Sequence, residues 1–78
     1  RYLAYDLGPK KIRVNCISPG GFYAGQDQTF VDRYSSKTPL GRMGDDYDLK
    51  GVGVFLASNA AKYITGINLP VDGGWTAR

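Results

Sequence analysis

The spacing of apolar positions changes several times along the chain, and each spacing predicts a different element. Residues 12–17 and 64–71 are short runs rich in β-branched residues that end at turn-forming residues, which predicts two strands. Residues 1–7, 28–36 and 45–57 place apolar side chains three and four positions apart. That spacing predicts the end of one helix, a short second helix and a longer third. The predicted order is therefore helix, strand, helix, helix, strand.

Aspartates mark the starts of the two later helices. Asp27 precedes the short helix as an N-cap, and Asp45 with Asp48 has the spacing of a capping box before the long one. The long helix also contains Gly51 and Gly53, each of which weakens a helix by up to about 1 kcal/mol relative to alanine. We therefore expect this helix to pack closely against another element.

More than forty residues with helical patterns separate the two predicted strands. This distance is too long for a hairpin and fits a parallel pair joined by a crossover, as in α/β proteins. The crossover is longer than one helix requires, and residues 22–38 leave the carboxyl end of the first strand, where open parallel sheets bind ligands. These residues are predicted to form a lid or substrate-binding segment. A surface loop without a functional role remains the alternative.

The first predicted strand ends in a turn that suits a ligand site. Pro19 has no N–H and fixes its own φ, so strand pairing is expected to end near Ser18. Gly20 and Gly21 permit backbone conformations closed to other residues and carry no Cβ to keep a planar ligand at a distance. The turn is therefore a candidate binding site. A plain turn without a ligand remains the alternative.

The length of the chain limits what it does alone. At 78 residues, eleven of them glycine, the conformational entropy lost on folding is roughly 120 kcal/mol, and apolar burial balances this narrowly at such a size. The chain begins at Arg1 inside a helical pattern too short to be stable by itself. We therefore expect a fragment of a larger domain that is inactive in isolation.

Charge and cysteine content narrow the classes of partner and location. The net charge is +3, but only residues 10–13 are densely basic, so no nucleic-acid partner is expected. No apolar run reaches membrane-spanning length and no signal pattern is present, so no membrane partner is expected. The single cysteine, Cys16, suits a reducing compartment, and we expect a cytoplasmic protein.

Four segments in order, residues 13–20, 39–43, 55–66 and 71–74, resemble the closing third of a short-chain dehydrogenase/reductase. The resemblance implies an α/β fold in which residues 1–78 are the C-terminal part of one doubly wound, parallel-sheet Rossmann-type domain, incomplete here. It implies NAD or NADP as the cofactor. It also implies that the catalytic Ser, Tyr and Lys precede Arg1, so no catalytic residue and no metal ligand is assigned within the chain.

The resemblance assigns the first glycine turn to the cofactor. By position, Pro19 and Gly20 would border the nicotinamide, and the backbone around Gly21 and Phe22 would face its carboxamide. Phe22 occupies the place of an aliphatic residue in most members. Ala24 stands where many members offer a threonine hydroxyl, so that side-chain contact is not expected here.

The substrate lid is assigned to Tyr23, Phe30 and Tyr34. This segment resembles a narrower group of bacterial oxidoreductases associated with modified-sugar pathways, including flagellin modification. The substrate is accordingly expected to be a small molecule.

Two classes of function follow from the resemblance. The first is an oxidoreductase that transfers a hydride between NAD or NADP and a carbonyl or alcohol. The second is a non-catalytic binding or scaffold protein of the same fold, and a Tyr-x-x-x-Lys motif upstream of Arg1 would separate the two. Family members are often dimers or tetramers, and a homo-oligomer with residues 68–78 at a subunit contact is expected. The alternative is that Trp75 folds back onto its own domain.

Overall fold

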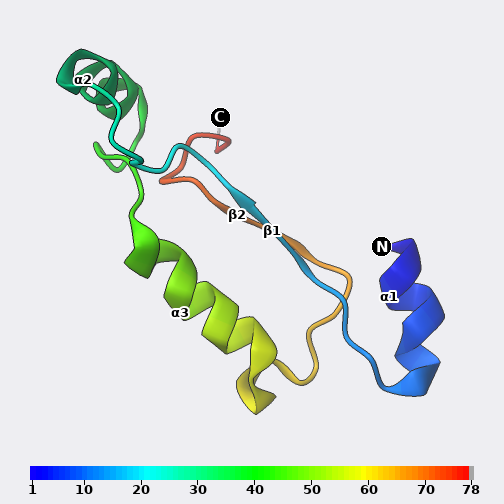
Figure 1. Ribbon diagram of the computed structural model, residues 1–78. Coiled ribbons are helices and arrows are strands. Elements are labelled where there is room, and N and C mark those ends of the chain that lie inside the picture. Colours follow the sequence, from blue (N-terminus) through cyan, green and yellow to red (C-terminus); the bar gives the residue numbers. More distant parts are fainter. Residues whose placement is uncertain (78) are drawn as a thin grey trace.

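The computed structural model describes residues 1–77 and has the predicted order of elements (Figure 1). Two 3₁₀ turns, Gly8–Lys10 and Asn59–Ala61, follow the first and last helices. The helices and strands are α1 (Tyr2–Leu7), β1 (Cys16–Pro19), α2 (Gln28–Lys37), α3 (Asp46–Ala57) and β2 (Asn68–Val71).

The two strands form a parallel pair, as the long crossover predicted. Cys16 lies opposite Asn68, and Pro19 lies opposite Val71. Everything between them, including α2 and α3, belongs to the crossover. The carboxyl ends of both strands therefore meet at the same edge of the sheet.

Both strands begin later than predicted because side chains make most of the hydrogen bonds between the two segments before Cys16, beside one backbone bond from the N–H of Gly66 to the carbonyl oxygen of Val14 (2.8 Å). The Asn15 amide donates to the carbonyl oxygen of Ile64 (3.0 Å) and accepts from the N–H of Ile67 (3.2 Å). The N–H of Val14 donates to the Thr65 hydroxyl (3.0 Å). The two segments are thus joined along their whole length, but regular strand geometry starts only after Asn15.

Strand β1 ends at Pro19, one residue past Ser18, so the predicted end near Ser18 is confirmed. The N–H of Cys16 donates to the carbonyl oxygen of Ile67, just before β2, and the N–H of Gly20 donates to that of Val71 in β2, both at 2.9 Å. In a parallel ladder alternate residues donate to a given neighbour, so the N–H that Pro19 lacks would point away from β2. Pro19 is tolerated at this position because β2 has no hydrogen bond to accept from residue 19.

The predicted helix caps are confirmed. The N–H of Phe30 donates to the Asp27 carboxylate at 2.9 Å at the start of α2. At the start of α3, the N–H of Tyr47 donates to Asp45 (3.0 Å), and the Asp48 carboxylate accepts from the N–H of Asp45 (2.8 Å). These are local bonds within four residues, which explains why the spacing alone predicted them.

The described residues enclose very little core. The radius of gyration is 15.3 Å, whereas a compact domain of this length has about 11.5 Å. In Figure 1, α1 stands apart at one end and α3 lies along one side of the strand pair. The buried apolar side chains are Ala4, Met43, Leu56 and Ala61.

The close packing predicted for Gly51 and Gly53 is not found among residues 1–77. A Cβ built at either position would have no atom of these residues within 4 Å. The α3 side chains Val54 and Phe55 are likewise exposed in this chain. Helix α3 thus presents an open apolar face.

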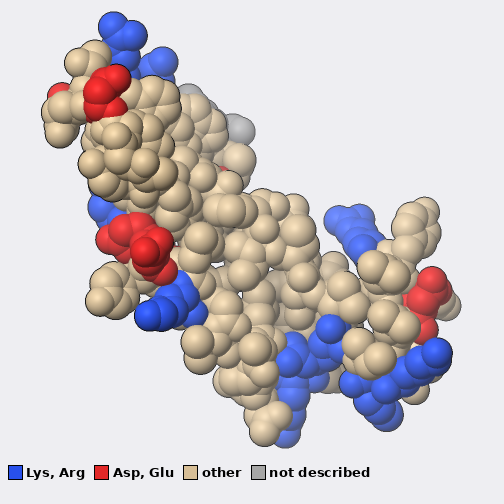
Figure 2. All heavy atoms as spheres, viewed as in Figure 1, with Lys and Arg blue, Asp and Glu red and all other residues tan. Residues whose placement is uncertain are grey.

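Charged side chains do not form one continuous stripe. On the side of the molecule seen in Figure 2, lysine and arginine lie at both ends, and aspartates lie between and beside them. No helix in the described part of the chain is long and apolar enough to span a membrane.

Candidate functional site

The turns after β1 and β2 meet the segment between α2 and α3 in what we call the strand-end region, residues 19–44 and 70–77. A pocket of about 280 Å³ lies within it. Backbone dominates this pocket, because four of its lining residues are glycines. The lining residues are Gly21, Phe22, Leu40, Arg42, Gly44, Asp48, Pro70, Val71, Asp72, Gly73 and Gly74.

Gly20 is required by packing within the chain. A Cβ at this position would lie 2.6 Å from Cβ and 2.8 Å from Cα of Asp72, closer than real Cβ atoms approach. The backbone of Gly20 lies outside the left-handed region, so conformational freedom is not its reason. Sequence reasoning assigned Gly20 to a ligand, whereas the structure gives it a first role in bringing the two turns together.

Gly21 is required by Tyr34 of α2. A Cβ on Gly21 would lie 2.2 Å from Cζ of the Tyr34 ring, and the N–H of Gly21 donates to the Tyr34 hydroxyl at 2.7 Å. The close approach of the ring is a steric contact and the hydrogen bond is a polar one, and both require the same position of the Tyr34 ring. Helix α2 is therefore attached directly to the turn after β1.

The Tyr34 ring also joins α2 to the turn after β2. It stacks on Trp75, with ring centroids 4.6 Å apart and planes 12° apart, and Phe30 lies along the same helix at 6.2 Å. Trp75 thus folds back onto its own chain, which was the alternative to an interface role. Its packing needs no second subunit, and the homo-oligomer stays a prediction.

The structure brings two of the three predicted lid residues together, because the rings of Phe30 and Tyr34 stack along α2. Tyr34 is half-buried against both turns, whereas Phe30 is 47% exposed and Tyr23 is 59% exposed. The backbone of Tyr23 is fixed, because its N–H donates to the carbonyl oxygen of Gly44 at 2.9 Å. Only Tyr34 among them has a structural link to the predicted cofactor turn.

Gly44 is a site residue that sequence reasoning missed. It pairs with Phe22 in an isolated parallel bridge, and a Cβ on Gly44 would lie 2.6 Å from the Phe22 ring. The N–H of Gly44 donates to the carbonyl oxygen of Gly21 at 3.0 Å. The sequence marked residues 38–44 as helix-breaking, but no local signal indicated that they would pair with Phe22.

Nearly all N–H groups of the turn after β1 donate hydrogen bonds within the chain. Those of Gly20, Gly21 and Tyr23 each donate to another part of the chain, and Pro19 has none. The N–H of Phe22 makes no hydrogen bond to any residue within 1–77. The turn therefore holds one N–H donor in a fixed position at the carboxyl end of β1.

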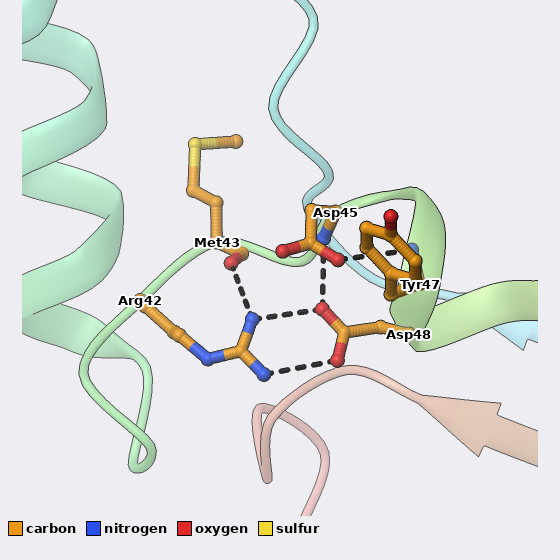
Figure 3. Close-up of polar contacts among 5 residues, drawn as sticks. All are labelled: Arg42, Met43, Asp45, Tyr47 and Asp48. Carbon is orange, nitrogen blue, oxygen red and sulfur yellow. Dashed lines mark hydrogen bonds and ion pairs between the residues drawn. The ribbon is translucent and has the colours of Figure 1, made fainter.

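Arg42 and Asp48 fasten the loop before α3 to its first turn (Figure 3). The guanidinium donates to both carboxylate oxygens, at 2.8 and 2.9 Å, and also to the carbonyl oxygen of Met43 at 3.1 Å. The hydrogen bond from Arg42 holds the pKa of Asp48 well below its usual range. Asp48 is therefore a structural carboxylate, unsuited to proton transfer near neutral pH.

Asp72 organises the turn after β2 in a similar way. Its carboxylate accepts from the Thr76 hydroxyl (2.7 Å) and from the N–H groups of Gly74 (2.9 Å) and Thr76 (3.2 Å). The bond from the Thr76 hydroxyl is the main cause of a lowered pKa for Asp72. Gly73 and Gly74 have φ values of +64° and +95°, so this turn requires glycine for conformational reasons.

The described residues supply no assembled reaction centre. They contain no group of three His, Cys, Asp or Glu side chains that could hold a metal ion. Tyr2 and Tyr5 of α1 are almost fully exposed, at the end of the chain away from the strand-end region (Figure 1).

Known proteins resemble this chain along nearly its whole length. A family model described as enoyl-(acyl carrier protein) reductase matches residues 1–76. The 2,5-dichloro-2,5-cyclohexadiene-1,4-diol dehydrogenase LinX of Sphingobium indicum is 40% identical over 77 residues, covering 94% of this chain and 31% of that protein. The L-rhamnose 1-dehydrogenase (NAD(P)(+)) of Azotobacter vinelandii is 44% identical over 77 residues, covering 91% of this chain and 30% of that protein.

A solved structure shows the same similarity in three dimensions. The short chain dehydrogenase from Leptospira borgpetersenii, described with bound NAD+, superimposes with a TM-score of 0.91 and 55% sequence identity, over 96% of this chain and 30% of that one. The predicted α/β fold with a parallel sheet is confirmed. The chain spans about 30% of the length of these relatives, so the open faces described above belong to a partial domain.

Proposed function

Because this chain belongs to the short-chain dehydrogenase/reductase family, we propose that the whole protein transfers a hydride between NAD or NADP and a small carbonyl or alcohol substrate. Family membership confirms the predicted Rossmann-type fold, and the relatives, which are named dehydrogenases and reductases, support an oxidoreductase. The identity of the nucleotide and of the substrate, including the modified-sugar subgroup, belongs to the proposal. The Leptospira relative is described with NAD+ bound, which supports a nicotinamide cofactor here.

The observation that carries the proposal is the Phe22 N–H. It belongs to a turn whose other N–H groups are used, and it lies beyond the carboxyl end of β1, where ligands bind in such sheets. A nicotinamide carboxamide is planar and offers one carbonyl oxygen, which matches the single N–H donor of Phe22. When bound, the cofactor supplies or accepts the hydride, and these residues orient its ring.

Residues 22–38 would cover the bound cofactor and substrate. Helix α2 lies against the turn that carries the donor, because Tyr34 contacts Gly21. Excluding water from a hydride transfer is the usual role of such a segment. We place Tyr23 and Phe30 on the substrate side of this lid, since both keep exposed aromatic surface in this chain.

The donor can be tested with cofactor analogues on the full-length protein. Thionicotinamide adenine dinucleotide replaces the carboxamide oxygen by a poorer acceptor, whereas 3-acetylpyridine adenine dinucleotide keeps the oxygen and lacks the amino group. Loss of one neutral hydrogen bond should weaken binding by roughly 2- to 10-fold. We expect that loss for the thio analogue, while the acetylpyridine analogue binds like the parent cofactor.

The wild-type protein decides between the two classes of function. Binding of NAD or NADP together with turnover of an alcohol or carbonyl supports the oxidoreductase. Binding without turnover of any alcohol tested, in a protein that lacks the upstream Tyr-x-x-x-Lys motif, would favour the non-catalytic alternative. A folded full-length protein that binds neither nucleotide overturns the proposal.

A further inference from the structure

One residue, Tyr34, joins the lid helix to both glycine turns. We propose that Tyr34 is a positioning residue that holds the first turn in the conformation presenting the Phe22 N–H, so that cofactor affinity depends on the position of α2. This inference rests on the proposed function of the turn as a cofactor wall. It adds a side chain, outside the turn itself, on which cofactor binding depends.

The contact between Tyr34 and Gly21 leaves the turn little freedom. The hydroxyl accepts the N–H of Gly21 at 2.7 Å, and the ring occupies the space where a Cβ of Gly21 would lie. Two consecutive glycines are otherwise the most flexible backbone available. By taking up this N–H, Tyr34 leaves the next N–H, that of Phe22, as the donor of the turn.

Tyr34 is itself held from two further directions. Its ring stacks on Trp75 at 4.6 Å, and its carbonyl oxygen accepts the Thr38 hydroxyl at 2.9 Å at the end of α2. Thr38 is buried, and a Cβ built on Gly73 would lie 2.7 Å from the Thr38 methyl group. The stacking on Trp75 and the attachment of the end of α2 to the turn after β2 both favour the position of the ring against Gly21.

Through these contacts, the position of α2 and the conformation of the turn after β1 depend on each other. If α2 moves away, Gly21 loses its acceptor and the turn is released. If a bound carboxamide holds Phe22, the turn is fixed and the closed position of α2 is favoured. The coupling must be the same in both directions, because it is a difference in binding free energy.

The test compares two tyrosine variants of the full-length protein. Tyr34→Phe keeps the ring and its stacking but removes the acceptor for Gly21. Tyr63→Phe makes the same chemical change on a fully exposed tyrosine outside the strand-end region. We expect the Kd for the bound nucleotide to rise roughly 2- to 10-fold in Tyr34→Phe and to stay unchanged in Tyr63→Phe.

A second readout does not depend on the cofactor. In the nucleotide-free protein the amide hydrogen of Gly21 should exchange with solvent several-fold faster in Tyr34→Phe than in wild type. Trp75→Leu should weaken nucleotide binding by a similar factor because it removes the stacking partner, whereas Trp75→Phe should restore most of the affinity. A residue with a merely structural role would lower the melting temperature without this selective effect on binding.

The outcomes separate this inference from the proposed function. Wild-type protein that binds nucleotide while Tyr34→Phe binds equally well, with unchanged exchange at Gly21, overturns the inference alone. Wild-type protein that binds neither NAD nor NADP overturns the proposed function, and the role of Tyr34 toward a cofactor with it. Weakened binding together with faster Gly21 exchange, confined to Tyr34→Phe, supports the inference.

Discussion

The strand-end region and helix α3 use glycine for opposite purposes. At Gly20, Gly21 and Gly44 a Cβ would lie within 3 Å of another part of the chain, so each glycine is held in place by contacts within residues 1–77. At Gly51 and Gly53 of α3 nothing in this chain lies within 4 Å. The strand-end region is therefore closed by its own residues, whereas α3 presents a surface that this chain does not cover.

The contrast is weaker for large apolar side chains. Tyr34 and Trp75 stack on each other in the strand-end region, but Leu40 of the same region is 71% exposed, beside 62% for Leu3 of α1 and 66% for Val54 of α3. Apolar surface of this extent is rarely left in solvent by a folded monomer. The strand-end region and the helices therefore both carry apolar side chains that residues 1–77 leave uncovered.

The largest loss of stability is expected when the 78-residue chain is expressed without the rest of the protein. Expressed alone, the chain should be unfolded or aggregated and should not turn over any nucleotide, because its core is small and the sheet exposes unpaired edges. Circular dichroism during heating and size-exclusion chromatography would test this. A sharp cooperative melt of a monomer would show that the strand-end contacts suffice to fold the chain.

A matched pair of glycine substitutions tests the comparison inside the full-length protein. Gly20→Ala should destabilise the fold by about 1–3 kcal/mol, because its Cβ would collide with the backbone of Asp72. Gly51→Ala should stabilise it by about 0.5–1 kcal/mol, because alanine favours an open helix position. Urea denaturation of both variants beside wild type measures the two signs.

The predictions for Gly20→Ala and Gly51→Ala can be contradicted independently. If Gly20→Ala lowers nucleotide affinity while the denaturation midpoint stays at the wild-type value, the ligand explains Gly20 better than Asp72 does. If Gly51→Ala destabilises the protein, α3 packs closely at Gly51 against residues outside 1–78. That result would restore the packing predicted from sequence.

The smallest effect is expected at the Arg42–Asp48 pair, which is partly exposed to solvent. The pKa of Asp48 is lower in the folded chain than its ordinary value, so the ionised carboxylate stabilises the fold above pH of about 4, and this stabilisation fades as the pH falls below it. Asp48→Asn should lower the melting temperature slightly at pH 7 and reduce the loss of stability on acidification. Asp46→Asn, in the same helix turn, controls for the helix dipole.

Melting temperatures from pH 7 to about pH 3 would show the difference between these two variants. Equal acid dependence in wild type and Asp48→Asn would mean that Arg42 does not hold this carboxylate in solution.

The sequence by itself determined the features that depend on neighbouring residues. Asp27 and Asp45 cap their helices as predicted, because a cap needs only the next three residues. The parallel pairing of the strands also followed from the length of the segment between them. The turn at Gly20 and Gly21 was located correctly, and four ordered motifs were enough to indicate the family.

Tertiary structure decided which distant segments share the turn. The contact of Tyr34 with Gly21 spans 13 residues along the chain, and the stacking of Tyr34 on Trp75 brings a crossover helix against the residues after β2. No local pattern encodes such contacts, because they depend on the path of the whole crossover. The packing reason for Gly20 was missed for the same cause: sequence shows that a Cβ is absent, and only the packed chain shows that Asp72 takes its place.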